Sequence, residues 1–147
     1  MKTKIIGLFT ALMLLSNLTF ATDGTKPSEQ LLKEFNRNFS QSAEVEWTQV
    51  GDYYKATFLM EGKYLTAYFD AFNNVESISR NITTNMLPII LQTNLKEKLS
   101  ESVWISDCFE LFGQNGTEYY VVIENADEKI FYQSNQAQWD VFKTVEK

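Results

Sequence analysis

Apolar and polar residues repeat with two different periods along the chain. Leu31, Leu32, Phe35 and Phe39 recur at helical spacing, and Pro27 suits the first turn of a helix that ends near Asn38. Four stretches with strand-like patterns follow, at residues 45–50, 53–60, 64–71 and 75–82. The short turns Gly51-Asp52, Glu61-Gly62 and Asn73-Asn74 separate them. Turns this short require neighbouring strands to run antiparallel.

The alternation within the second and third predicted strands indicates which face is buried. One face carries the apolar set Tyr54, Ala56, Phe58 and Met60, then Leu65, Ala67, Phe69 and Ala71. We expect the helix to cover that face. The opposite face is polar and rich in tyrosine, as expected for an antiparallel sheet with one solvated side. It carries Tyr53, Lys55 and Thr57, then Tyr64, Thr66 and Tyr68.

The same order of elements then repeats. A second helix is predicted over residues 85–99, with Leu91, Leu95 and Leu99 on one stripe and Pro88 in its first turn. Strand patterns follow at residues 103–112, 118–125, 129–133 and 139–144. The predicted fold class is therefore α+β. Two tandem repeats of a helix and four antiparallel strands, 27–83 and 84–147, form a single domain. We expect one sheet covered on one face by both helices.

The first 21 residues have the layout of a secretory signal. Lys2 and Lys4 precede an apolar run from Ile5 to Leu15, and Thr19-Phe20-Ala21 places small residues around a cleavage point after Ala21. The apolar run is shorter than the roughly 20 residues that cross a bilayer. We predict a cleaved signal peptide at 1–21, a flexible leader at 22–26, and no stable membrane insertion after cleavage.

The composition of the mature chain limits its partners. Cleavage leaves 126 residues, a length typical of one domain, and shifts the formal net charge from −6 to −8. This negative charge disfavours nucleic acid and anionic lipid surfaces, so we expect neither as a partner. The 19 aromatic residues that remain indicate a packed fold.

The chain contains no histidine and one cysteine, Cys108. These counts exclude histidine-based triads, histidine-ligated metals and an intrachain disulfide. Cys108 lies in a predicted strand, where it is either a small buried hydrophobe or a redox-sensitive or intermolecular thiol. Asp107 and Glu110 beside it do not favour a thiolate. We therefore predict that the protein is not an enzyme and holds no cofactor or metal.

Two groups of carboxylates offer alternative chemistry. Glu44 and Glu46 lie two residues apart at the start of a strand, where they either form a catalytic pair or discourage edge-to-edge aggregation. The segment 124–128 collects three carboxylates and an amide, which either bind calcium or form a solvated hairpin tip. In both cases the second interpretation is favoured. Glu44 and Glu46 open an edge-like strand, and the segment 124–128 lacks the spaced loop and glycine of a dedicated calcium site.

The tyrosine-rich face is the candidate binding surface. Tyr53, Tyr64 and Tyr68 are expected to cluster there beside Lys55, and Trp47 lies either on this face or in the core. Tyrosine and tryptophan contribute much of the energy of protein interfaces. The alternative is that these rings only stabilise the sheet as cross-strand pairs.

Several short motifs accompany this order of elements, and together they resemble a known family. They are Ala43-x-Val45-x-Trp47, Tyr54-x-Ala56-x-Phe58, Ala67-Tyr68-Phe69, Ser79-Arg80-Asn81-Ile82, Leu87-Pro88 and Glu124-Asn125-Ala126-Asp127. Over about residues 27–145 the chain resembles the exported β-lactamase-inhibitor-like, PepSY-like family of Bacteroidetes. The resemblance implies the fold given above, a periplasmic or secreted location, and an open sheet face that grips a protein. It implies no catalytic motif and no particular target.

The sequence thus predicts an exported, non-catalytic binding module whose partner is an envelope protein or peptide held on the tyrosine-rich face. The alternative is a small-ligand carrier or sensor of the cell envelope, with aromatic residues lining a pocket between sheet and helices. An envelope scaffold without a tight partner also remains open.

Overall fold

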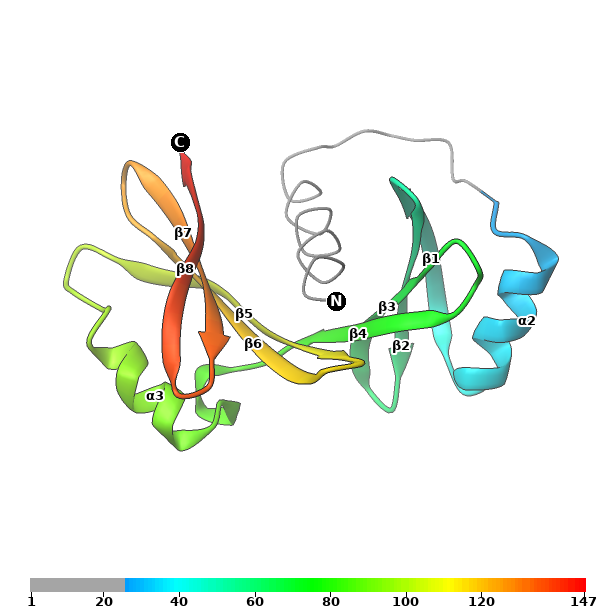
Figure 1. The fold of residues 1–147 in the computed structure, drawn as a ribbon, viewed down its shortest axis with the longest axis horizontal. Helices are drawn as coiled ribbons and strands as arrows, with labels where there is room; N and C mark the ends of the chain where they lie inside the picture. Colours follow the sequence, from blue (N-terminus) through cyan, green and yellow to red (C-terminus); the bar gives the residue numbers. More distant parts are fainter. Residues whose placement is uncertain (1–25) are drawn as a thin grey trace. The chain divides into compact units, whose positions relative to one another are not determined.

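The computed structural model describes residues 26–147 (Figure 1). The predicted signal peptide and nearly all of the leader lie outside the described residues. The chain is α+β, with eight strands in the sequential order β1 to β8 of one antiparallel sheet. It divides into two compact units: unit 1 ends at Ile78, and unit 2 runs from Ser79 to Lys147.

Within residues 26–78, unit 1 contains one helix and the first strands of the sheet. Its elements are α2 (Glu29–Asn38), β1 (Ala43–Val50), β2 (Tyr53–Met60), β3 (Lys63–Phe69) and the first part of β4 (Val75–Asn81). Helix α2 begins at Glu29, so Pro27 lies before the helix and not in its first turn as predicted. The Ser28 side chain caps the helix by accepting a hydrogen bond from the Leu31 amide at 3.1 Å. In the turn between β2 and β3, Glu61 and Gly62 have φ of 51° and 73°. Positive φ at both positions is typical of a tight hairpin turn.

The core of unit 1 lies between α2 and one face of the sheet. The helix buries Leu31, Phe35 and Phe39 against the strand residues Ala56, Phe58, Ala67 and Phe69, as the alternation predicts. Phe35 is the centre of this core, since its ring lies 5.1 Å from that of Phe58 in an edge-on contact. The prediction fails at Ala71. Strand β3 ends at Phe69, and Ala71 is exposed in the following turn.

Unit 2 contains the remainder of β4, the 3-10 helix η2 (Thr84–Met86), α3 (Ile89–Lys96), β5 (Trp104–Gly113), β6 (Gly116–Glu124), β7 (Glu128–Asn135) and β8 (Gln138–Glu146). Helix α3 buries Leu91 and Leu95 against Cys108, Val121, Ile123 and Trp139. The buried Trp139 indole donates a hydrogen bond to the Leu91 carbonyl at 3.0 Å, which ties α3 to β8. The expected helix over 85–99 is shorter than predicted, because Pro88 separates η2 from α3 and the helix ends at Lys96. Leu99 is consequently partly exposed rather than in the core.

Candidate functional site

The candidate surface is the face of the unit 1 sheet opposite α2, called here the open face. The antiparallel register places alternate residues of β1, β2 and β3 on it. These are Glu46, Thr48 and Val50, then Tyr53, Lys55, Thr57 and Leu59, then Tyr64, Thr66 and Tyr68. Four of the five predicted site residues belong to this set.

The register shows that the three tyrosines do not form one cluster. Lys55 lies opposite Tyr68, and Leu59 lies opposite Tyr64. Six residue steps along β2 separate Tyr53 from Leu59, which is about 20 Å at 3.4 Å per residue. Tyr53, Lys55 and Tyr68 therefore gather near one end of the strands, and Tyr64 lies near the other. The expectation that Tyr53, Tyr64 and Tyr68 cluster is wrong. The register between β2 and β3 places Tyr64 opposite Leu59, at the far end of β2 from Tyr53.

Tyr64 is the most accessible of these tyrosines. Its side chain is 60% exposed, and its hydroxyl donates a hydrogen bond to the Glu44 carboxylate at 2.5 Å. This hydrogen bond raises the pKa of the Tyr64 phenol above its ordinary value. Glu44 lies in a bulge of β1, between the pairs that Ala43 and Glu46 form with β2, and its φ is 53°. The bulge turns one of the two predicted carboxylates to the tyrosine, so Glu44 positions Tyr64.

The other end of the open face is more enclosed. Tyr53 and Lys55 are half-buried, and Tyr68 is only 3% exposed. Burial lowers the pKa of the Lys55 ammonium group, and the Glu46 carboxylate opposes this shift. The expectation that Tyr68 is open to solvent is wrong.

Trp47 belongs to the core and not to the open face. It pairs with Ala56, and its ring lies 5.2 Å from Phe35 and 5.8 Å from Phe69. Of the two positions that the sequence left open for Trp47, the structure shows the one beneath α2. Trp47 therefore leaves the set of surface candidates, since a ring packed between helix and sheet presents little area to a partner.

Cys108 is buried in unit 2, as expected for a small buried hydrophobe. Its side chain is 6% exposed on β5. Burial raises the pKa of the thiol to about 12, and Asp107 and Glu110 add to this effect. A thiol with this pKa stays protonated at neutral pH and is a poor nucleophile.

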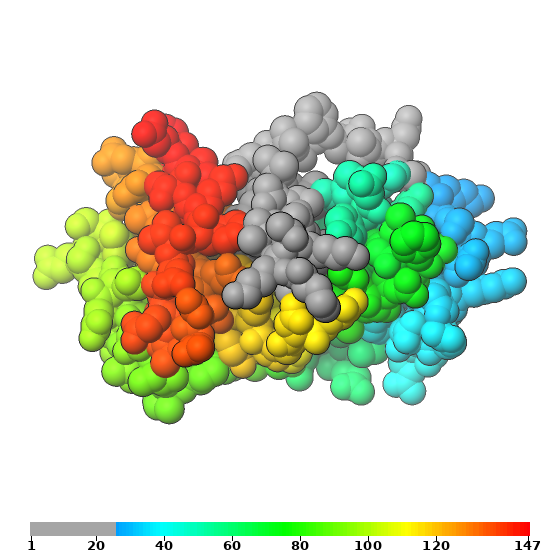
Figure 2. Space-filling view, in the orientation of Figure 1, coloured from blue at the N-terminus to red at the C-terminus, as the bar shows by residue number. Residues whose placement is uncertain are grey.

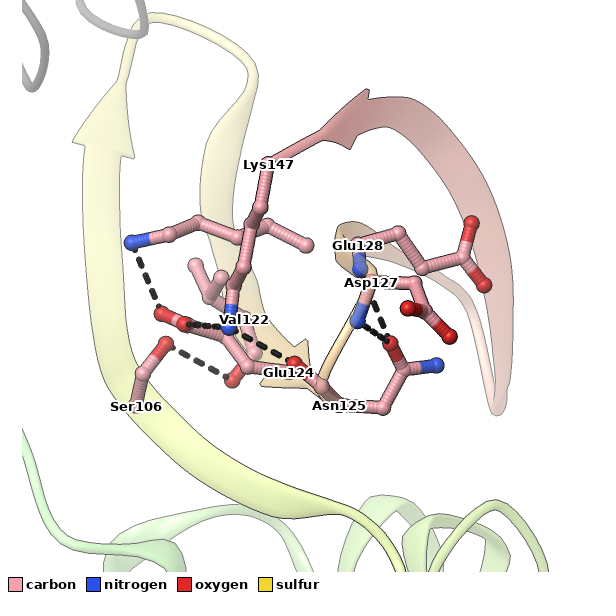
Figure 3. A network of polar contacts seen from close by, with 8 residues as sticks. Ser106, Val122, Glu124, Asn125, Asp127, Glu128 and Lys147 are labelled. Carbon is pink, nitrogen blue, oxygen red and sulfur yellow. Dashed lines mark hydrogen bonds and ion pairs between the residues drawn. The ribbon is translucent and has the colours of Figure 1, made fainter.

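The acidic segment 124–128 forms a polar network (Figure 3). Glu124 is buried and forms ion pairs with Lys129 and Lys147, each at 2.9 Å. These lysines, with Ser106, lower the pKa of Glu124 to about 2. The Asn125 side-chain oxygen accepts hydrogen bonds from the Asp127 and Glu128 amides at 2.8 Å. The segment is thus a hairpin turn whose tip, Ala126 and Asp127, is exposed as predicted, whereas Glu124 at its start is buried and paired with two lysines.

Within residues 26–147, the structure contains no group of three or more carboxylates or cysteines arranged to hold a metal ion. In the same residues, no helix is both long and apolar enough to cross a membrane.

Phe72 is the most exposed large apolar residue in the described part of the chain, and the sequence analysis did not single it out. Phe72 lies in the turn between β3 and β4 and is 81% exposed. Its position in the sequence was the available signal. Phe72 lies three places after the core residue Phe69, so it does not continue the series of core-facing residues, and it directly precedes the turn residues Asn73-Asn74.

Comparison with known proteins shows that solved structures share this fold. No family model matches the chain, and no curated protein matches it. Several solved structures from Bacteroides are similar to it. A BLIP-like protein from Bacteroides fragilis aligns with a TM-score of 0.66 and 20% identity over 82% of this chain and 86% of its own.

A DUF2874 family protein from Bacteroides uniformis aligns with a TM-score of 0.72 and 13% identity over 82% of this chain and 90% of its own. A protein from Bacteroides eggerthii, named for an inferred periplasmic location, aligns with a TM-score of 0.70 and 12% identity over 82% and 89%. At these identities the comparison establishes the fold, and the chain has the fold of these BLIP-like and DUF2874 proteins.

Proposed function

We propose that this protein is an exported, non-catalytic binding module of the cell envelope that holds a protein or peptide on the open face of unit 1. The proposal is supported by a set of aromatic and charged side chains on that face that are half-buried or exposed. Tyr53, Lys55 and Tyr64 offer two phenols and an ammonium group on a rigid sheet, whereas the core beneath α2 is filled with rings. Amphipathic rings on a rigid support are typical of binding surfaces, because little side-chain entropy is lost on contact.

Three further observations support a binding role over catalysis. The chain has no histidine, so general acid–base work falls to carboxylates, tyrosine or lysine. The single thiol is buried, with a raised pKa. The fold is shared with a protein named BLIP-like and with one named for an inferred periplasmic location, which fits an exported binder.

The proposal is tested by affinity capture from an envelope extract of the producing bacterium. The mature chain is compared with a Tyr53→Ala, Lys55→Ala, Tyr64→Ala triple variant and with Val141→Ala, a control at an exposed apolar residue of unit 2. We expect the triple variant, folded by circular dichroism, to lose the captured partner while the control retains it. Equal recovery of the partner by all three chains would refute the assignment of the open face as the binding surface.

A thermal-shift screen against small envelope metabolites addresses the carrier alternative. A stabilisation of the wild-type chain by one metabolite, unaffected by the triple variant, would favour a carrier over the proposed binder. Binding to the native state stabilises it by mass action, so a ligand present at 100 times its Kd adds about 2.7 kcal/mol.

A further inference from the structure

The turn between β3 and β4 presents a phenylalanine on a backbone that is already fixed. The Asp70 carboxylate accepts hydrogen bonds from the amides of Phe72 at 2.9 Å and Asn74 at 2.8 Å. The Asn74 side-chain amide donates to the same carboxylate at 3.2 Å. Backbone hydrogen bonds of 3.0 Å join Asp70 to Asn73 and to Asn74, and Asn73 has a φ of 65°. The turn therefore holds one conformation without a contribution from the Phe72 ring.

The Phe72 side chain is not part of the core of unit 1. The other four phenylalanines of the described part of this unit are at most 5% exposed in its core: Phe35, Phe39, Phe58 and Phe69. Phe72 is 81% exposed, and the turn that carries it lies on the surface seen in Figure 2 (green). An aromatic ring on a rigid turn is suited to be an anchor, because binding it does not require the backbone to be ordered first.

Carboxylates surround this end of the sheet. Tyr54 pairs with Phe69, so the turn at Asp52 and the turn at Asp70 lie at the same end of the strands. Glu76, Asp70 and Asp52 all raise the pKa of the Tyr53 phenol, after the effect of burial, which shows that the three charges lie near it.

We infer that this end of unit 1, with Phe72 at its tip, is the docking point for a protein surface that has an apolar pocket bordered by lysine or arginine side chains. The exposed ring supplies the apolar contact, and the carboxylates at Asp52, Asp70 and Glu76 select a basic border by charge complementarity. The inference rests on the proposed function and deepens it by naming the chemistry of the partner and the end of unit 1 that contacts it.

A phage-displayed library of random 12-residue peptides provides a defined probe. The library is selected on the immobilised mature chain, and individual peptides are then measured against Phe72→Ala and Asp52→Asn/Glu76→Gln. Ile89→Ala is the matched control, since Ile89 is an apolar residue of unit 2 that is 76% exposed. We expect the selected peptides to combine lysine or arginine with apolar residues. Their affinity should fall about tenfold or more in Phe72→Ala, a size typical of a binding anchor.

The salt dependence separates the two parts of the inference. In the Asp52→Asn/Glu76→Gln variant, binding should become weaker and less sensitive to salt, while Ile89→Ala binds as the wild type does. The inference is overturned if the peptides lack basic residues, if Phe72→Ala binds them equally well, or if no peptide is selected. Peptides that ignore Phe72→Ala but are lost in the Tyr53, Lys55 and Tyr64 triple variant would refute this inference and leave the proposed function standing.

Discussion

Replacement of Phe35 by alanine tests the description of the unit 1 core most directly. The Phe35 side chain is 2% exposed, and its ring contacts those of Phe39, Trp47, Phe58 and Phe69 at centroid distances of 5.1 to 6.3 Å. Removal of a buried phenyl ring costs about 3–5 kcal/mol, because transfer energy is lost and a cavity is left. The several ring contacts favour the upper half of this range, since each aromatic pair adds roughly 0.5–1.5 kcal/mol.

The assay is urea unfolding followed by tryptophan fluorescence, because Trp47 lies 5.2 Å from Phe35 and reports on this core. With a slope of about 2 kcal/mol/M, the loss lowers the unfolding midpoint by roughly 2 M. The control is the same substitution at Phe72, where 81% exposure predicts a change within about 0.5 kcal/mol. Similar midpoints for Phe35→Ala and Phe72→Ala would refute the assignment of the core.

Three further predictions concern unit 2. Glu124, whose pKa is lowered to about 2, contributes stability above its ordinary pKa of 4.5 that is lost as the pH falls toward 2. Glu124→Gln should therefore be less stable than the wild type at neutral pH and lose less stability between pH 4.5 and 2. If the free energy of unfolding changed with pH by the same amount in both proteins, this prediction would be contradicted. Cys108, buried with a pKa of about 12, should react with a thiol reagent at pH 8 only after denaturation, and rapid labelling of the native chain would argue otherwise. Trp139→Phe leaves the Leu91 carbonyl without its 3.0 Å donor and should destabilise the protein by about 1–3 kcal/mol in the same urea assay, whereas an unchanged midpoint would mean that water replaces the indole.

Much of the fold follows from local patterns. The alternation of Tyr54, Ala56 and Phe58 assigned the face beneath α2 correctly, because a side-chain period of two is a property of the strand itself. The turn at Glu61-Gly62 was located for a similar reason, since few residues adopt positive φ at low cost. Boundaries were less accurate where one residue decides them, as at Pro88 and Ala71.

The candidate surface depended on information that the pattern does not contain. The sequence correctly assigned Tyr53 and Tyr64 to one face, but their separation of about 20 Å follows from the register of β2 against β3. Trp47 and Val45 alternate together in the sequence, and only the packing of α2 shows that Trp47 is in the core. The same holds for Glu124, which reads as one of several turn carboxylates until Lys147 folds back to it.

The sequence by itself determined the secondary structure, the buried faces and the absence of histidine chemistry, because each depends on neighbouring residues or on composition. The tertiary structure decided which tyrosines stay accessible, which carboxylate is paired and where an unused phenylalanine is displayed. These depend on contacts between residues far apart in the chain, such as Glu44 with Tyr64 and Glu124 with Lys147. Such contacts are fixed only when strands, turns and helix pack together, and no local pattern encodes them.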